Sequence, residues 1–258
     1  MRTNQEQIRI RFTGNELKLL ACLSMLTDHT ALVFGFSGPA EFICRHLIGR
    51  LAFPVFAFLL VQGFLHTGNS KRYFQNLFLF ALLSELPYDL ALFCGANSRE
   101  TASFSGFLQL LDPKLLSGFF THQNTLFTLS LGLLMLLAIK KTEALLLRRA
   151  SAYDRISLAR LLVILLFGSL SQRLGLDYGF MGMACIGAMY CFRGSRKQAA
   201  FWGCICLQLD FFSMPGAFLS LIPLSLYNGE RGRGRKYFFY LFYPLHLLLL
   251  TGIKVLLF

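Results

Sequence analysis

Residues 46–66 read HLIGRLAFPVFAFLLVQGFLH, an apolar run with a single charged side chain, Arg50, inside it. An α-helix rises 1.5 Å per residue, so about 20 such residues cross the roughly 30 Å hydrocarbon core of a bilayer. The stretch therefore predicts a transmembrane helix, and runs of similar composition recur on both sides of it.

The whole chain has the composition of a membrane protein. Hydrophobic residues make up 55% and charged residues 15% of it, against about 25% charged in soluble domains. We expect an all-α fold, a polytopic transmembrane bundle of about nine spans that forms one domain over residues 1–258. Besides 46–66, the expected spans are 17–36, 73–94, 124–140, 157–172, 177–192, 199–212, 216–228 and 237–257. The short pair 199–212 and 216–228 is either two thin spans or one re-entrant pair.

Charge gives these spans a direction. The net charge of +12 does not indicate nucleic acid as a partner, because Lys and Arg lie in the short connections between apolar runs. Cytoplasmic connections are rich in Lys and Arg, so we expect the polar residues 1–16 in the cytoplasm. The connections then predicted inside carry Lys71, Arg72, Lys140, Lys141, Arg148, Arg149, Arg155, Arg193, Arg196, Lys197, Arg231, Arg233, Arg235 and Lys236. Those predicted outside carry Arg45, Arg99, Lys114, Arg173 and Lys254.

The longest outer connection, 95–123, contains the mixed segment FSGFLQLLDPKLLSGFF at 104–120. Asp112-Pro113 interrupts it, so it does not predict a span. We expect a helix lying in the membrane interface, or a lid over an outer cavity.

Ionisable side chains within spans are costly and indicate function by default. Glu85 and Asp89 lie four residues apart, on one helix face, with Arg50 as the nearest candidate cation. The alternative reading is an ion-pair network that only fixes helix packing.

Lys18 and His29 are eleven residues apart, so they share one helix face about 17 Å apart along the axis. This spacing suits a long ligand with phosphates at Lys18 and a reactive end at His29, which would act as general base. The alternatives are a Lys18 that snorkels to the headgroups and a His29 that only packs. Glu85 is expected to orient His29 better than Asp28, which points about 100° away. His246 is a second acid or base, or a ligand contact. We expect no metal site, because no zinc-ligand spacing is present.

Several stretches together resemble the TraX family, conjugation-associated membrane proteins linked to acetylation of the pilin N-terminus. They are LKL at 17–19 with Met25, DH at 28–29, GRLAFPVFAF at 49–58, QGF at 62–64, SELPYDL at 84–90, FTL at 127–129 after Asn124, DYG at 177–179, YNG at 227–229 and FYPLH at 242–246. The pattern is also distantly similar to acyltransferase-3 and heparan-type acetyltransferases, which carry a basic residue eleven before a first-helix His.

This resemblance implies an acetyltransferase of the bacterial cytoplasmic membrane that uses acetyl-CoA as co-substrate. It implies His29 as the key catalytic residue. The polar residues within the spans add Glu85, Asp28 and His246 as further catalytic candidates. The candidate contacts of acetyl-CoA are Lys18, Arg50, Asn124, Tyr243 and Asn228, and Arg50 or Asn124 would polarise the acyl carbonyl. The acceptor, a pilin-like N-terminus or an envelope glycan or lipid hydroxyl, stays open.

Two other classes of function fit the same residues. A proton-coupled transporter would use the intramembrane charges and the two short segments, although no inverted repeat is evident. A non-catalytic assembly partner for pilin-like or envelope proteins would need none of these side chains for chemistry.

Overall fold

The computed structural model describes residues 11–96, 122–147, 153–210, 215–234 and 236–257. Regular structure in these ranges is helical, as expected. Pairing of the β type is confined there to two isolated bridges, Phe12 with Tyr227 and Gln123 with Leu176.

The first helix, α1 (Gly14–Val33), begins at a capping box. The Thr13 hydroxyl accepts a hydrogen bond from the Glu16 backbone N–H at 3.4 Å, and the Thr13 N–H donates to the Glu16 carboxylate at 2.7 Å. Each side chain thus satisfies a backbone donor that the first turn leaves without a partner. The N–H groups of Gly14 and Asn15 donate to the carbonyls of Glu230 and Arg231. The basic loop near the C-terminus therefore packs on the start of α1.

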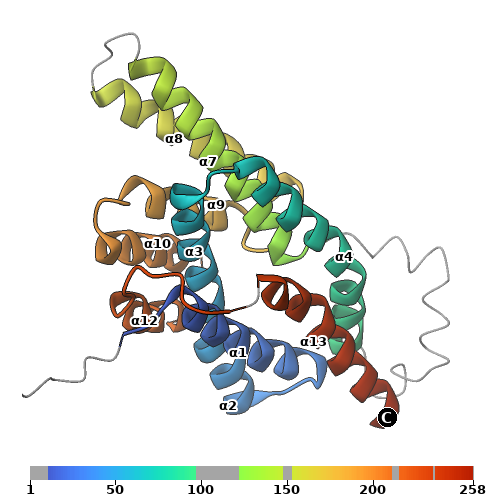
Figure 1. Ribbon diagram of the computed structural model, residues 1–258. Helices are drawn as coiled ribbons and strands as arrows, with labels where there is room; N and C mark the ends of the chain where they lie inside the picture. Colours follow the sequence, from blue (N-terminus) through green and yellow to red (C-terminus); the bar gives the residue numbers. More distant parts are fainter. Residues whose placement is uncertain (1–10, 97–121, 148–152, 211–214, 235, 258) are drawn as a thin grey trace, which may run out of the picture.

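A nearly continuous helical run follows from Gly38 to His66. It consists of α2 (Gly38–Glu41), the π-helix η1 (Phe42–Ile48), the 3₁₀ turn η2 (Gly49–Leu51) and α3 (Ala52–His66). Most of α3 is buried, and it lies in the middle of the bundle in Figure 1, with α1, α7, α9 and α10 around it. Apolar residues occupy every side of α3, which explains its central place.

The remaining helices pack around this centre. They are α4 (Ser70–Ala96), α7 (Thr125–Leu147), α8 (Tyr153–Arg173), α9 (Gly179–Cys191), α10 (Arg196–Asp210), α11 (Gly216–Leu219), α12 (Leu221–Ser225) and α13 (Lys236–Leu257). The last helix, α13, lies along α4 and against α1, while α7 and α8 form a hairpin that projects at the top of Figure 1.

The expected number of spans, about nine, is not confirmed. Of the described residues, three stretches are long and apolar enough to cross a membrane: Gly38–His66, Ser70–Phe93 and Tyr237–Leu257. The expected span 216–228 breaks at Ser220 into α11 and α12, which are too short to cross about 30 Å. Arg45, expected in an outer connection, lies instead within the helical run, because the helix begins well before residue 46.

The predicted interfacial helix at 104–120 lies outside the described residues.

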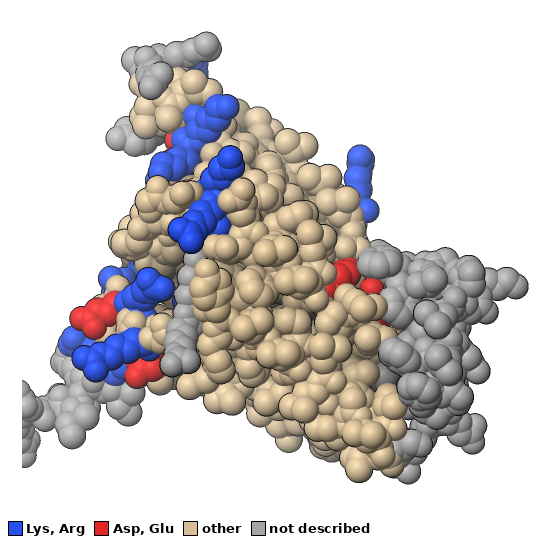
Figure 2. Space-filling model, turned by 45° about the vertical axis from the view of Figure 1, so that its right-hand side comes forward, with Lys and Arg blue, Asp and Glu red and all other residues tan. Residues whose placement is uncertain are grey.

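The surface of the described part is that of a membrane protein. Large apolar side chains on α8 are exposed, namely Leu158, Leu161, Leu162, Leu165, Leu166 and Leu170. In Figure 2, most of the visible Lys and Arg lie toward the left side, and the middle of the face shows no charged side chain. A broad apolar surface of this kind is suited to contact with lipid. The orientation of the N-terminus stays a prediction.

Candidate functional site

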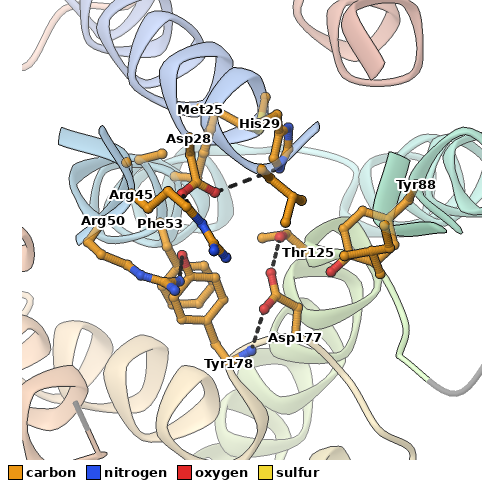
Figure 3. Close-up of a pocket in the computed structure, with 15 residues that line it drawn as sticks. Met25, Asp28, His29, Arg45, Arg50, Phe53, Tyr88, Thr125, Asp177 and Tyr178 are labelled. Atoms are coloured by element: carbon orange, nitrogen blue, oxygen red, sulfur yellow. Dashed lines mark hydrogen bonds and ion pairs between the residues drawn. The ribbon is translucent and has the colours of Figure 1, made fainter. Parts of the chain in front are cut away.

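A pocket of about 110 Å³ lies where α1, the η1–η2 turn, α3 and α4 meet the start of α7 and the connection between α8 and α9. Charged and polar side chains cover much of its wall (Figure 3), and Met25, Leu32, Phe56 and Leu92 form part of the rest. The polar lining residues are Asp28, His29, Arg45, Arg50, Tyr88, Thr125, Asp177 and Tyr178.

The contact between α1 and η2 brings the first part of this wall together. The Ser24 hydroxyl donates to the Ile48 carbonyl at 2.6 Å, a carbonyl near the irregular end of η1. One turn later on α1, Asp28 lies against Gly49, where the absence of a side chain leaves room for the carboxylate. Asp28 and His29 therefore face the residues that follow η1.

The π-helix explains why two arginines reach the same pocket. Its hydrogen bonds join residues five apart, as the Gly49 N–H bonded to the Cys44 carbonyl shows, and so bring residues five apart over one another. Arg45 lies in the π-helix and Arg50 just beyond it in η2, whereas in a regular α-helix residues five apart would point about 140° from each other. Arg45 Nε lies 3.9 Å from Asp28 Oδ1. Short π-helical segments are frequent at functional sites.

Asp177 and Tyr178 form the opposite wall, between α8 and α9. The Thr125 hydroxyl donates a hydrogen bond to the Asp177 carboxylate. Tyr178 has a φ of 61°, the only positive value for a non-glycine residue in the described ranges, and this conformation costs about 1–3 kcal/mol. It places the Tyr178 ring on Phe53, with centroids 3.9 Å apart, and the hydroxyl 3.3 Å from Arg50 Nη1, which donates to it.

His29 lies at the edge of the pocket and is buried, with 7% of its surface exposed. Its Nε2 is 4.0 Å from Asp28 Oδ2 on the pocket side. Its Nδ1 is 2.7 Å from His246 Nε2 on α13. The pocket thus combines an imidazole, two guanidinium groups and two carboxylates in a small, largely enclosed space. This combination is suited to moving a proton beside an anionic group.

Glu85 and Asn124 belong to a second polar cluster, between α4 and α7. The backbone N–H and side-chain amide of Asn124 donate to Glu85 Oε2 at 3.2 and 2.5 Å, and the amide also donates to the Ala81 carbonyl. Asn124 Oδ1 accepts from the Leu126 N–H and so caps α7. The side-chain groups of Asn124 are therefore engaged in structure, and Glu85 orients Asn124, whereas the sequence predicted that it orients His29.

The other predicted contacts lie along α1 and α13. Lys18 Nζ is 5.3 Å from the centroid of Phe239, so the face with Lys18 and His29 packs against α13 at both ends. The buried ring of Tyr243 lies edge-on to His29, with centroids 6.1 Å apart. Asn228 lies elsewhere, where its N–H donates to the Phe12 carbonyl and its amide to Glu230.

Sequence reasoning missed Arg45, Thr125, Asp177 and Tyr178 as site residues. For Asp177 and Tyr178 a signal existed, since DYG at 177–179 is one of the matching motifs. Arg45 was expected in an outer connection, so no sequence pattern placed it in the site. Among the described residues, no three His, Cys, Asp or Glu side chains are arranged to hold a metal ion.

A family model described as "TraX protein" matches residues 13–254. The chain belongs to the TraX family. A relative of this TraX protein, the probable fimbrial assembly protein FimC of serogroup H1 from Dichelobacter nodosus, is 29% identical over 265 residues, which cover 95% of this chain and 97% of the relative. The comparison with solved structures gives no match.

The family resemblance inferred from the motifs is thus confirmed. The TraX match includes every residue that lines the pocket. The wider resemblance to acyltransferase-3 and heparan-type acetyltransferases stays a prediction.

Proposed function

We propose that this member of the TraX family is a membrane acetyltransferase that moves an acetyl group from cytoplasmic acetyl-CoA to a membrane or extracytoplasmic acceptor. The observation that carries the proposal is the position of His29 Nε2, which faces a pocket with Asp28 and Arg45. A buried imidazole next to fixed cations has the two parts that acyl transfer needs, a base and a stabiliser of negative charge.

In the proposed reaction, His29 takes a proton from the N–H or O–H of the acceptor as the acceptor atom bonds to the acyl carbon. Negative charge develops on the acyl oxygen, where Arg45 and Arg50 stabilise it. The carbon–sulfur bond then breaks, and the leaving thiolate takes the proton from His29. The products are an acetylated acceptor and CoA with a free thiol, so atoms and charge balance.

The donor is proposed to approach along α1, with Lys18 near the phosphates of acetyl-CoA. Because α13 covers this face of α1, the donor must enter beside α13 or displace it. The printed name of the Dichelobacter nodosus relative refers to fimbrial assembly, and this supports a pilin-like protein N-terminus as acceptor. An envelope glycan or lipid hydroxyl is the other acceptor class.

The test uses purified protein in lipid nanodiscs with acetyl-CoA and a bacterial envelope extract as the source of the acceptor, with release of the CoA thiol as readout. We expect His29→Ala to lower turnover at least 100-fold, the lower end of a general-base contribution of roughly 10²–10⁴. His66→Ala is the matched control, because His66 lies on α3 and its Nδ1 bonds the carbonyl of Gln62 away from the pocket. Equal turnover of the His29→Ala and wild-type proteins would falsify the proposal.

Mass spectrometry of envelope components identifies the acceptor. Cells with the His29→Ala protein should lose an acetyl mass from one component, and cells with the His66→Ala protein should keep it.

A second candidate function is a non-catalytic part in pilus assembly, which the name of the relative favours. Normal pilus or envelope assembly in cells whose protein has His29, Glu85 and His246 replaced together would support it over catalysis.

A further inference from the structure

His29 and His246 are 217 residues apart in sequence and form a hydrogen-bonded pair inside the bundle. Their rings are nearly coplanar, with 12° between the planes and 5.0 Å between the centroids. His29 Nδ1 and His246 Nε2 are 2.7 Å apart, so one hydrogen lies between them and one of the two nitrogens donates it to the other. Both residues are buried, with 7% and 5% of their surfaces exposed.

The hydrogen bond at the other side of His246 determines which nitrogen carries that proton. His246 Nδ1 lies 2.7 Å from the Phe242 carbonyl oxygen. A carbonyl oxygen can only accept, so His246 Nδ1 must carry a hydrogen. In a neutral imidazole the other nitrogen then carries no hydrogen and has a lone pair, so His246 Nε2 is the acceptor.

His29 must therefore donate from Nδ1 to His246 Nε2. A neutral His29 with hydrogen on Nδ1 has its lone pair on Nε2, the nitrogen that faces Asp28 and the pocket. The Phe242 carbonyl, through His246, thus fixes both the ring orientation and the basic nitrogen of His29.

We infer that His246 is a positioning residue, which holds His29 in the tautomer that presents a basic Nε2 to the acceptor. The catalytic part of this inference rests on the proposed acetyl transfer. When His29 takes a proton from the acceptor, its Nδ1–H faces the lone pair of His246, so the pair stabilises the imidazolium by a charge-assisted hydrogen bond. The role resembles that of the third member of a catalytic triad, which orients a base and does not touch the substrate.

Three substitutions separate this role from simple packing. In the wild-type protein the Phe242 ring stacks on His246 with centroids 4.8 Å apart. His246→Phe keeps a flat ring at this position but removes the hydrogen bonds to His29 and to the Phe242 carbonyl. His246→Gln keeps an oxygen that accepts from His29 and an amide that donates to the Phe242 carbonyl. His66→Phe is the matched control, because His66 also bonds a carbonyl four residues earlier and lies away from this pair.

Nitrogen NMR of protein labelled with ¹⁵N-histidine reads the tautomer directly. The chain has 5 histidines, and the His29 signals are assigned by their loss in His29→Ala. We expect an unprotonated Nε2 and a protonated Nδ1 for His29 in wild type, His246→Gln and His66→Phe, and a mixture of tautomers in His246→Phe.

Thiol release from acetyl-CoA, in the presence of the same envelope extract as the source of the acceptor, is the second readout. We expect His246→Phe to lose about 100-fold or more in turnover, and His246→Gln to stay within about tenfold of wild type. A protonated Nε2 on His29 in wild type overturns the inference, and so does a His246→Phe protein with the wild-type tautomer and rate. If the wild-type protein has the expected tautomer but releases no thiol, the proposed function fails while the assignment of His246 to the tautomer of His29 stands.

Discussion

Gly49 of η2 lies so close to Asp28 of α1 that a Cβ atom on Gly49 would be 2.7 Å from both the Cβ and the Oδ1 of Asp28. This contact is shorter than van der Waals packing permits, so any side chain at residue 49 must move α1 or Asp28. The close approach of the two helical segments brings the carboxylate of Asp28 to Arg45. The smallest residue at position 49 is therefore a condition for the shape of the pocket.

We predict that Gly49→Ala lowers the free energy of unfolding by about 1–3 kcal/mol, the usual cost of adding a methyl group to a packed interface. The measurement is thermal unfolding in detergent. Gly252→Ala is the control, because Gly252 lies within α13 and a Cβ there meets no atom within 4 Å beyond its chain neighbours and the nearby backbone of its own helix. An equal effect of the two substitutions contradicts the prediction.

Asn124 joins α4 to α7 through Glu85. Asn124→Ala leaves the buried Glu85 carboxyl without its side-chain donor and removes the α7 cap. We expect it to lower the free energy of unfolding by about 1–3 kcal/mol. Thr142→Ala, which removes a hydroxyl that donates to the Ala138 carbonyl of its own helix, is the comparison. If Asn124→Ala unfolds no earlier than Thr142→Ala, the cluster contributes little.

The Tyr178 hydroxyl accepts a hydrogen bond from Arg50, while its ring stacks on Phe53. Tyr178→Phe keeps the ring and releases the guanidinium. We expect the proposed acetyl transfer to fall roughly tenfold, equivalent to about 1.4 kcal/mol, with an unchanged melting temperature. Tyr240→Phe tests the loss of a hydroxyl alone, because Tyr240 stacks on Phe80 in a similar way. A normal rate for Tyr178→Phe means that the hydroxyl does not hold Arg50 for catalysis.

The orientation of the chain is tested by single cysteines in a protein whose 7 native cysteines are replaced by serine. Ser37→Cys and Gly194→Cys are both at exposed positions in connections between helices. With a cytoplasmic N-terminus, a membrane-impermeant maleimide should label residue 37 in intact cells and residue 194 only after permeabilisation. The opposite pattern reverses the predicted orientation, and labelling of both in intact cells contradicts the predicted order of crossings between them.

The amino-acid sequence was enough to predict a helical membrane protein of the TraX family. Apolar runs and the placement of Lys and Arg are local properties, and so is the periodicity that puts Lys18 and His29 on one face of α1. The number of spans was harder to predict, because composition does not reveal a break such as Ser220, where α11 ends.

The site itself depended on tertiary structure. The sequence predicted Arg45 in a connection outside the span that holds Arg50, and the irregular helical segment at 42–51 brings both arginines to the pocket. The partner of His29 is His246, 217 residues away, and not the Glu85 that the sequence favoured. Helical periodicity specifies which residues share a face of one helix, but the angle and register at which two helices pack decide which faces meet, and these depend on side-chain packing across the whole bundle.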